Sequence, residues 1–368
     1  MFRTKQPLKL LENRVSRIYS GGFLLDCFLD KENQMDSHFP ENWLGSTVVA
    51  KMSGGSHKGI EGQSQILTSS GQKLNLRSFL QENASEILGD SHIKKYGANP
   101  GVLVKLLDSA IRLPIQVHPT QELAQKYFNS RFGKTEAWVV LGTRKIDGVD
   151  PYILLGFREG VSRETFAQMI NEQDIKALEQ CFHKISVREG DVFLVEAGIP
   201  HAIGQGCFML EIQEPTDITL RAERNVGGIE IEEREAFQGL SLNDFLNCFK
   251  FETLSATDVL QKYRLNPHLI KKIPGHGQEQ WLIRYSDTPY FAVRSINIES
   301  SWKMSGYGSF HILLITSGKG CLSGSDFSQI IKRGDSFLVP NHLPYMIENQ
   351  GDGILQAMTC WGPELNLV

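Results

Sequence analysis

Short apolar runs, each bounded by glycine or another turn residue, recur along most of this chain. They include residues 101–119, 152–157, 192–195 and 207–213, and several more between 281 and 368. Many of the 34 glycines lie at the ends of these runs. Strands that alternate with turns in this way are typical of β-sandwiches and β-barrels. We therefore expect a mainly β protein.

A few segments instead carry apolar residues three or four positions apart, the spacing of an amphipathic helix. These segments are 76–89, 161–182, 240–249 and 255–263, and Ser162 is placed to cap the second of them. We expect the 161–182 helix to pack on the sheet as an appendage. Residues 15–30 are expected to form one or two strands around Gly21 and Gly22. Residues 56–75, rich in glycine and serine, are expected to form an exposed loop.

An internal repeat divides the chain into two parts. GDVFLVEAGIPHAI at 190–203 aligns without a gap with GDSFLVPNHLPYMI at 334–347, and His201 falls opposite Tyr345. Two copies of one β unit are therefore expected. We predict a first domain at 1–263 with the helical segments, a linker at 264–280, and a degenerate second domain at 281–368 that lacks metal ligands.

Composition narrows the class of protein. A net charge of -4 over 368 residues argues against a nucleic-acid partner. No apolar run reaches the roughly 18 residues of a membrane span, and the N-terminal residues do not resemble a signal peptide. The six cysteines are scattered, with no CxxC pair, as expected for thiols in a reducing compartment. We expect a cytoplasmic protein without a membrane contact or an obligate protein partner.

Candidate chemistry is concentrated between Ile111 and Trp138. Gln116 and His118 lie two positions apart in an apolar run, so on a strand both side chains point to the same face. Lys134 and Glu136 form a second pair with the same spacing. Imidazole and carboxylate are metal-ligand types. His201, at the start of a later predicted strand, is the third ligand candidate.

The sequence motifs in these segments resemble those of a known family. GD, a strand, a Gly-x-Pro turn and a histidine form a pattern similar to the second motif of cupins, which are small double-stranded β-helix barrels. LVKLLDSAIRLPIQVHP, then GKTEAW, then AGIPHAIGQGCFMLEIQEPTDITLR resemble together the type I mannose-6-phosphate isomerases in their short bacterial form. The motifs cover about residues 15–225. The resemblance implies two cupin-like jelly-roll units with helical appendages, the first of them catalytic.

The resemblance also implies an activity and roles for individual residues. Gln116, His118, Glu136 and His201 would hold one Zn²⁺ per chain, with Gln116 in the first or the second coordination shell. The enzyme would interconvert mannose 6-phosphate and fructose 6-phosphate through an enediolate. The remaining implied roles are catalysis by Arg221 and Lys134, and binding of the phosphorylated hexose by Lys105.

Two departures from the family's wording leave the substrate and the mechanism open. Pro114 stands where the family usually has a serine, and EPTDITLRAE replaces a run closer to SDNTLRAG, so the chain could also be an isomerase of another sugar phosphate. The base that moves the carbon-bound proton is Glu211, Glu214 or a metal-bound hydroxide. Two competing classes of protein are a non-catalytic sugar-binding or regulatory cupin and an iron dioxygenase.

Overall fold

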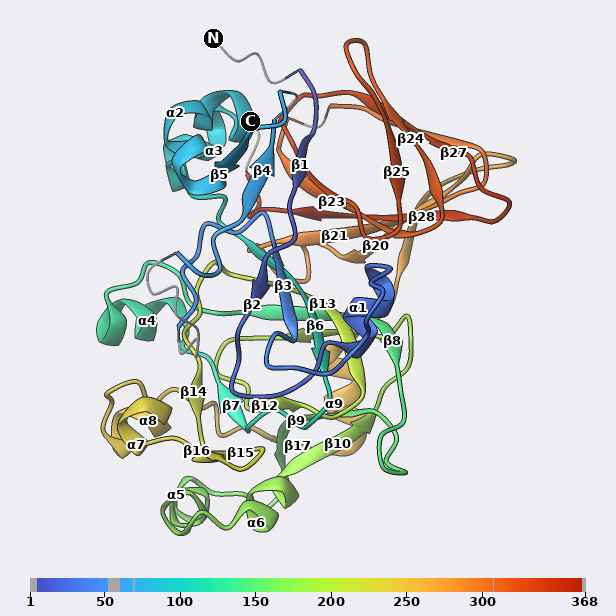
Figure 1. Ribbon diagram of the computed structural model, residues 1–368. Helices are drawn as coiled ribbons and strands as arrows, with labels where there is room; N and C mark the ends of the chain where they lie inside the picture. The colour runs from blue at the N-terminus through green and yellow to red at the C-terminus, as the bar shows by residue number, and fades with distance from the viewer. Residues whose placement is uncertain (1–4, 52–59, 69, 307, 366–368) are drawn as a thin grey trace.

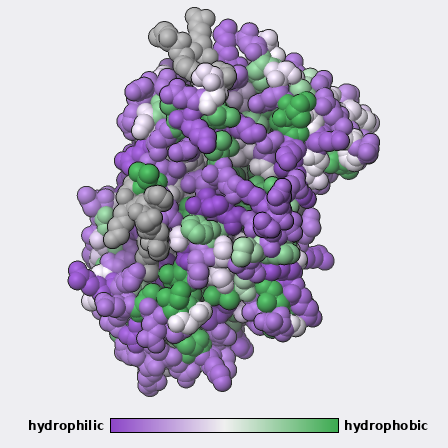
Figure 2. Space-filling model, viewed as in Figure 1, coloured by the Kyte–Doolittle hydropathy of each residue, from purple (hydrophilic) through white to green (hydrophobic). Residues whose placement is uncertain are grey.

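Antiparallel strands make up most of the structure, which is a computed structural model that describes residues 5–51, 60–68, 70–306 and 308–365 (Figure 1). The expected mainly β architecture is confirmed. Among these residues the strands form open sheets and not a closed barrel. Hydrophilic side chains cover most of the face shown in Figure 2.

Two sheets build the first unit. The seven-stranded sheet has the order β18 (Arg264–Leu265), β11 (Val192–Val195), β8 (Glu136–Thr143), β13 (Cys207–Gln213), β6 (Leu103–Ser109), β3 (Glu41–Leu44) and β2 (Arg14–Val15). The facing sheet has the order β10 (Phe182–Ser186), β9 (Tyr152–Arg158), β12 (His201–Ile203), β7 (Gln116–Val117) and β14 (Leu220–Arg221), and β17 (Thr253–Leu254) pairs with β9. A small ribbon joins β15 (Asn225–Val226) to β16 (Ile229–Glu230).

Two further sheets build the second unit. The larger has the order β19 (His268–Ile273), β20 (Gly277–Ile283), β21 (Ala292–Ile298), β28 (Leu355–Trp361), β23 (His311–Ser317), β26 (Ser336–Val339), β1 (Leu8–Leu10), β4 (Gln65–Leu67) and β5 (Lys73–Asn75). The smaller has the order β22 (Ser301–Met304), β27 (Tyr345–Asn349), β24 (Lys319–Ser323) and β25 (Ser328–Lys332). The N-terminal strands β1, β4 and β5 thus extend a sheet of the C-terminal unit.

The described helices are α1 (Phe23–Phe28), α2 (Leu76–Leu88), α3 (Asp90–Tyr96), α4 (Gln121–Phe128), α5 (Arg163–Glu172), α6 (Ile175–Gln180), α7 (Glu233–Ala236), α8 (Leu242–Leu246) and α9 (Ala256–Tyr263). The helices α2–α8 lie at the periphery of the sheets, whereas α1 and α9 lie among the strands of the first unit in this view (Figure 1). The 161–182 segment forms α5 and α6, and Ser162 caps α5 as expected. None of the described helices is long and apolar enough to cross a membrane.

Three sequence-based expectations need correction. Residues 23–28 form α1 and not a strand, because Gly22 adopts a positive φ of 116° and the carboxylate of Asp108 accepts hydrogen bonds from the backbone of Gly22 and Leu24. The 56–75 segment contains β4 and β5 within its described residues, while 56–59 and 69 lie outside them. The expected linker at 264–280 contains β18, β19 and the start of β20, so local proline and polar residues misled the prediction. The division into two domains remains a prediction.

Each of the two units has an apolar core of its own, and a further core lies between them. One cluster fills the space between the sheets of the first unit and includes Trp138, Phe193 and Met209. Another fills the second unit around Ile296, Leu313 and Ile347. A third, the largest, lies between the units and joins residues of β6, β8 and β13 to residues of β21, β23 and β28. Burial of this apolar surface stabilises the contact between the units, because each Å² of apolar surface removed from water contributes roughly 25 cal/mol of stabilising free energy.

Candidate metal centre and adjoining pocket

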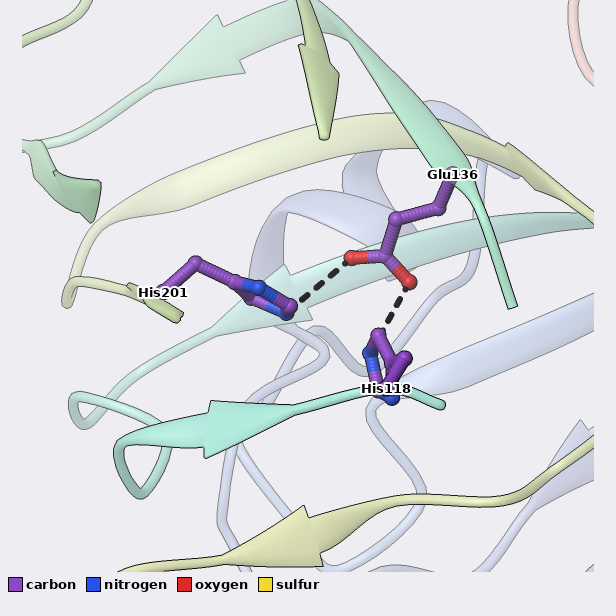
Figure 3. Close-up of side chains that lie close together, drawn as sticks. All are labelled: His118, Glu136 and His201. Carbon is purple, nitrogen blue, oxygen red and sulfur yellow. Dashed lines mark ion pairs between the residues drawn. The ribbon is translucent and has the colours of Figure 1, made fainter. Parts of the chain in front are cut away.

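Three side chains from neighbouring strands converge in the first unit. Glu136 is the first residue of β8, His201 is the first residue of β12, and His118 directly follows β7. Their candidate ligand atoms all lie within 4.8 Å of one another, and all three residues are buried. His118 Nε2 lies 3.2 Å from Glu136 Oε2, and His201 Nε2 lies 3.3 Å from Glu136 Oε1 (Figure 3).

Backbone carbonyls fix how the two imidazoles face the centre. Nδ1 of His118 lies 2.9 Å from the carbonyl oxygen of Ile218, and Nδ1 of His201 lies 2.8 Å from that of Ile199. A carbonyl only accepts, so each Nδ1 carries the proton and each Nε2 presents a lone pair to the centre, where Lys134 can donate to His118 and the Gln116 amide to His201. Metal-bound histidines are commonly oriented in this way. The observed donor set therefore fits a divalent transition metal such as zinc.

Electrostatics keep the ligand candidates in the protonation states that a metal needs. Burial, with the positive charge of Lys134 as a second cause, lowers the pKa of His118 to about 3. Burial alone would raise the pKa of Glu136, but Lys134 and His118 together hold that pKa well below its usual range. A neutral imidazole and an ionised carboxylate result at neutral pH.

Gln116 and Lys134 complete the immediate surroundings. Gln116 pairs with His201 across β7 and β12, and its Nε2 lies 3.2 Å from His201 Nε2. Turning the amide over would place its oxygen, the atom that can bind a metal, at the same position. Lys134 Nζ lies 2.7 Å from both His118 Nε2 and Glu136 Oε2. All the ligand candidates and the expected lysine thus come together.

Gln116 and Lys134 also line a pocket, and half of the residues in its wall are charged. Its lining includes Lys105, Pro114, Glu211 and Arg221, together with Arg17, Tyr19, Glu41, Asp217 and Thr219. Burial lowers the pKa of Arg221 to about 10, which leaves the guanidinium charged at neutral pH. Pro114, the residue at which the sequence departs from the family that it resembles, lies at the pocket wall.

Lys105 is buried and has two carboxylate neighbours. Its Nζ lies 2.9 Å from Glu211 and 3.9 Å from Glu41, and 5.1 Å from the ring centroid of Trp43. Burial raises the pKa of Glu211, and Lys105 opposes that shift. Lys105 is therefore a buried, ion-paired cation at the pocket.

Arg17 and Asp217 are pocket residues that sequence reasoning missed. Arg17 donates hydrogen bonds to both oxygens of Glu41, at 2.9 and 3.0 Å, and to both oxygens of Asp217, at 3.1 and 3.2 Å. Arg17 and Asp217 are 200 positions apart. In the sequence, Arg17 and Asp217 each appear only as a charged residue next to apolar residues. That pattern does not show that the two side chains pair with each other.

Glu211 and Glu214 occupy different surroundings. Glu211 lines the pocket. The carboxylate of Glu214 instead accepts hydrogen bonds from the backbone of Gly133 and Thr135, at 3.2 and 3.1 Å, and from the Gln121 side chain at 2.7 Å. Glu214 therefore holds the loop that carries Lys134 and is not part of the pocket lining.

The second unit repeats this arrangement with other residue types. Val195 and Val339 are equivalent in the internal repeat, and Val195 pairs with Glu136 whereas Val339 pairs with His311. Tyr345 takes the place of His201, and its hydroxyl lies 2.8 Å from Nε2 of His311.

The register extends the correspondence to the buried cation. Lys105 pairs with Glu211 and Trp43 on neighbouring strands, and Arg294 pairs in the same way with Thr359 and Trp281. Arg294 also bonds Glu279 at 2.9 Å, as Lys105 approaches Glu41. The repeat thus keeps the cation, glutamate and tryptophan but replaces both ligand positions for which the register gives an equivalent.

Comparisons with known proteins agree with this geometry. No family model matches the chain. The mannose-6-phosphate isomerase ManA of Bacillus subtilis is 25% identical over 241 residues, which are 65% of this chain and 69% of that protein. The mannose-6-phosphate isomerase of Streptococcus mutans is 28% identical over 247 residues, which are 65% of this chain and 68% of that protein.

A solved structure covers more of the chain. The mannose 6-phosphate isomerase from Bacillus subtilis matches with a TM-score of 0.74 and 21% identity, over 96% of this chain and 99% of that one. The resemblance first indicated by QVHP, GKTEAW and the segment around His201 is thereby confirmed. In sequence and in fold, this chain is similar to the mannose-6-phosphate isomerases.

Proposed function

We propose that this protein is a metal-dependent aldose–ketose isomerase that interconverts mannose 6-phosphate and fructose 6-phosphate in the cytoplasm. The observation that carries the proposal is the buried group of His118, Glu136 and His201 beside a pocket that Lys134 and Arg221 line. A site that only bound a metal or a neutral sugar would not need both cations. The named relatives act on the same substrate by their printed names.

Zinc is the proposed metal, one per chain. His118, Glu136 and His201 would hold it, with Gln116 as a fourth ligand or as a neighbour that orients His201. When bound, the metal supplies positive charge that polarises the sugar carbonyl and stabilises negative charge on the adjacent oxygens.

The chain's own residues would carry the proton transfers. Isomerisation moves one proton between C1 and C2 while a second proton moves between the two oxygens. Glu211 is the proposed carbon base, because it lines the pocket and burial raises its pKa above the ordinary value, which strengthens it as a base. Lys134 is placed to handle the proton at the oxygens, and Arg221 stabilises the enediolate charge.

Lys105 is the proposed contact with the phosphorylated hexose. Its ammonium is paired with Glu211 at 2.9 Å and lies 3.9 Å from Glu41, so it would bind the substrate beside the proposed carbon base. The backbone amides on either side of Pro114 are already engaged, since Leu113 N–H donates to the carbonyl of Ile203 and Ile115 N–H donates to the carboxylate of Glu223.

A coupled assay with mannose 6-phosphate, run beside glucose 6-phosphate and with metal analysis of the same sample, tests the proposal. We expect fructose 6-phosphate to form from mannose 6-phosphate alone, and one zinc per chain. Turnover of glucose 6-phosphate only would make this an isomerase of another sugar phosphate. Zinc without turnover of either substrate would favour a binding protein, and iron in place of zinc would favour oxygenase chemistry.

A further inference from the structure

A second cleft opens between the two units, away from the metal centre. It has a volume of about 400 Å³. One wall consists of Phe28, part of β8 around Leu141, and the turn at Gly190. The other wall is the face of four adjacent strands, β20, β21, β28 and β23. Binding sites for small molecules commonly have this size and lie at such junctions.

The composition of the sheet face changes where the cleft opens. On β21, Val293 is buried in the core between the units, whereas Ser295 and Asn297, two and four positions further along the same face, line the cleft. On β28 the same change runs from Cys360 in that core to Gln356 in the cleft. The strands β21 and β28 thus contribute apolar side chains to the core between the units and hydrogen-bonding side chains to the adjoining cleft.

These groups are uncharged. Gln280, Ser295, Asn297, Thr316, Ser317 and Gln356 all line the cleft. Gln280 donates to Ser295 at 3.2 Å, but the described residues provide no hydrogen-bond partner for the side-chain amides of Asn297 and Gln356. An amide both donates and accepts, as a sugar hydroxyl does, and Phe28 and Met358 add apolar surface for a sugar ring.

The charges at the rim do not favour an anionic ligand. Arg333 is engaged by the backbone oxygen of Cys27 at 3.0 Å and by the carboxylate of Asp30. Glu189, also at the cleft, adds negative charge. Arg333 is the one cation among the described residues that line the cleft, and Asp30 and Glu189 offset its charge, so the cleft has no net positive charge to attract a phosphate.

We infer that this cleft binds a neutral sugar, one without a phosphate group. The site is independent of the metal and of isomerase activity. Because the contacts are uncharged hydrogen bonds made by side chains that are partly exposed to water, we expect a dissociation constant of about 1 mM.

Ligand-observed NMR with D-mannose and with mannobiose tests the inference on the full chain. We expect saturable binding of at least one probe. It should survive in His201→Ala, which alters the metal centre, and weaken at least about tenfold in both Asn297→Leu and Gln356→Leu. Gln329→Leu removes an amide from β25, outside the cleft, and should bind as the wild type does.

Isomerase turnover and thermal melting of the leucine variants check that they fold. Both cleft residues have exposed surface, so at least one variant should retain the wild-type melting temperature. The inference is overturned if neither probe saturates, if binding disappears in His201→Ala, or if it persists in a folded Asn297→Leu or Gln356→Leu protein. Absence of turnover in every variant and in the wild type would instead contradict the proposed function and leave the binding result intact.

Discussion

The ammonium of Lys134 lies 2.7 Å from the same carboxylate, Glu136, whose two oxygens face the histidines of the candidate metal centre. Lys134 is therefore close enough to interact with any cation held there. It also contacts Nε2 of His118, the atom that would bind the metal. A metal and the ammonium compete for the same lone pairs, which connects metal affinity to this lysine.

Removing that competitor should separate metal binding from turnover. We expect Lys134→Met to hold zinc at least as tightly as the wild type, because a positive charge beside the metal is lost. Turnover should fall by about 10²- to 10⁴-fold, the usual contribution of one positioned proton-transfer group. Zinc retention against a graded series of chelator concentrations and steady-state kinetics measure the two effects. Weaker zinc binding in Lys134→Met would mean that the lysine supports the ligands and does not compete with the metal.

Removing a ligand should empty the site without unfolding the protein. Glu136→Ala and His201→Ala should each lose most of the zinc measured by elemental analysis, and their turnover with it. His311→Ala is the matched control, because His311 is the equivalent of Glu136 in the second unit and should leave zinc unchanged. Chelated wild type should keep its melting transition, since the apolar cores do not depend on the metal. Full zinc in Glu136→Ala would rule out the assigned centre.

The two candidate base residues should respond differently to neutral substitution. Glu211→Gln should reduce kcat strongly at every pH and leave zinc in place, because it removes the proposed carbon base. Glu214→Gln should reduce kcat more mildly, since the amide oxygen can still accept one of the hydrogen bonds that hold Gly133 and Thr135. Hydrogen exchange of those two amides should become faster in Glu214→Gln only. Slower turnover in Glu214→Gln than in Glu211→Gln would mean that Glu214, and not Glu211, is the carbon base.

Arg221 is expected to act mainly in the transition state. Arg221→Ala should fold, retain zinc and lose kcat by about 10²- to 10³-fold, the effect of removing one donor from a developing oxyanion. Arg221→Lys keeps a positive charge and should recover part of that loss. A change confined to KM would place Arg221 at the phosphate or at another group that binds equally in the ground state.

The sequence predicted those helices and strands whose formation depends on residues close together in the chain. The helix at 76–89 was predicted from Leu76, Phe79, Leu80, Ile87 and Leu88, and all five are buried in α2. The two same-face pairs and His201 were predicted for the same reason, since each ligand candidate lies in or beside a strand with its own motif. The helix α1 was missed because its start depends on the side chain of Asp108, more than eighty positions away.

Long-range ion pairs were beyond the reach of the sequence. Nothing near Arg17 indicates that Glu41 and Asp217 surround it, and nothing near Lys105 indicates which of several glutamates it meets. The choice between Glu211 and Glu214, three positions apart, depends on which way each side chain points at the end of β13. Only the packed strands decide that direction.

Acid should destabilise the protein through His311. Burial lowers the pKa of His311 to about 3, from an ordinary value of 6.5. Between these two values the unfolded chain binds a proton that the folded chain does not. Stability therefore falls as the pH decreases below about 6.5, by up to about 1.4 kcal/mol per pH unit from this residue alone.

His311→Gln should remove that contribution. Glutamine cannot take up the proton. Urea unfolding at a series of pH values gives the free energy of unfolding as a function of pH, and the slope of that free energy against pH should be smaller in His311→Gln, by up to the equivalent of one proton per molecule between about pH 4 and 6. His268→Gln changes an exposed histidine of β19 and is the matched control substitution. Equal slopes in the wild type and in His311→Gln would mean that the imidazole is protonated in the folded state. In that case the 2.8 Å contact with the hydroxyl of Tyr345 would be a hydrogen bond donated by the imidazolium.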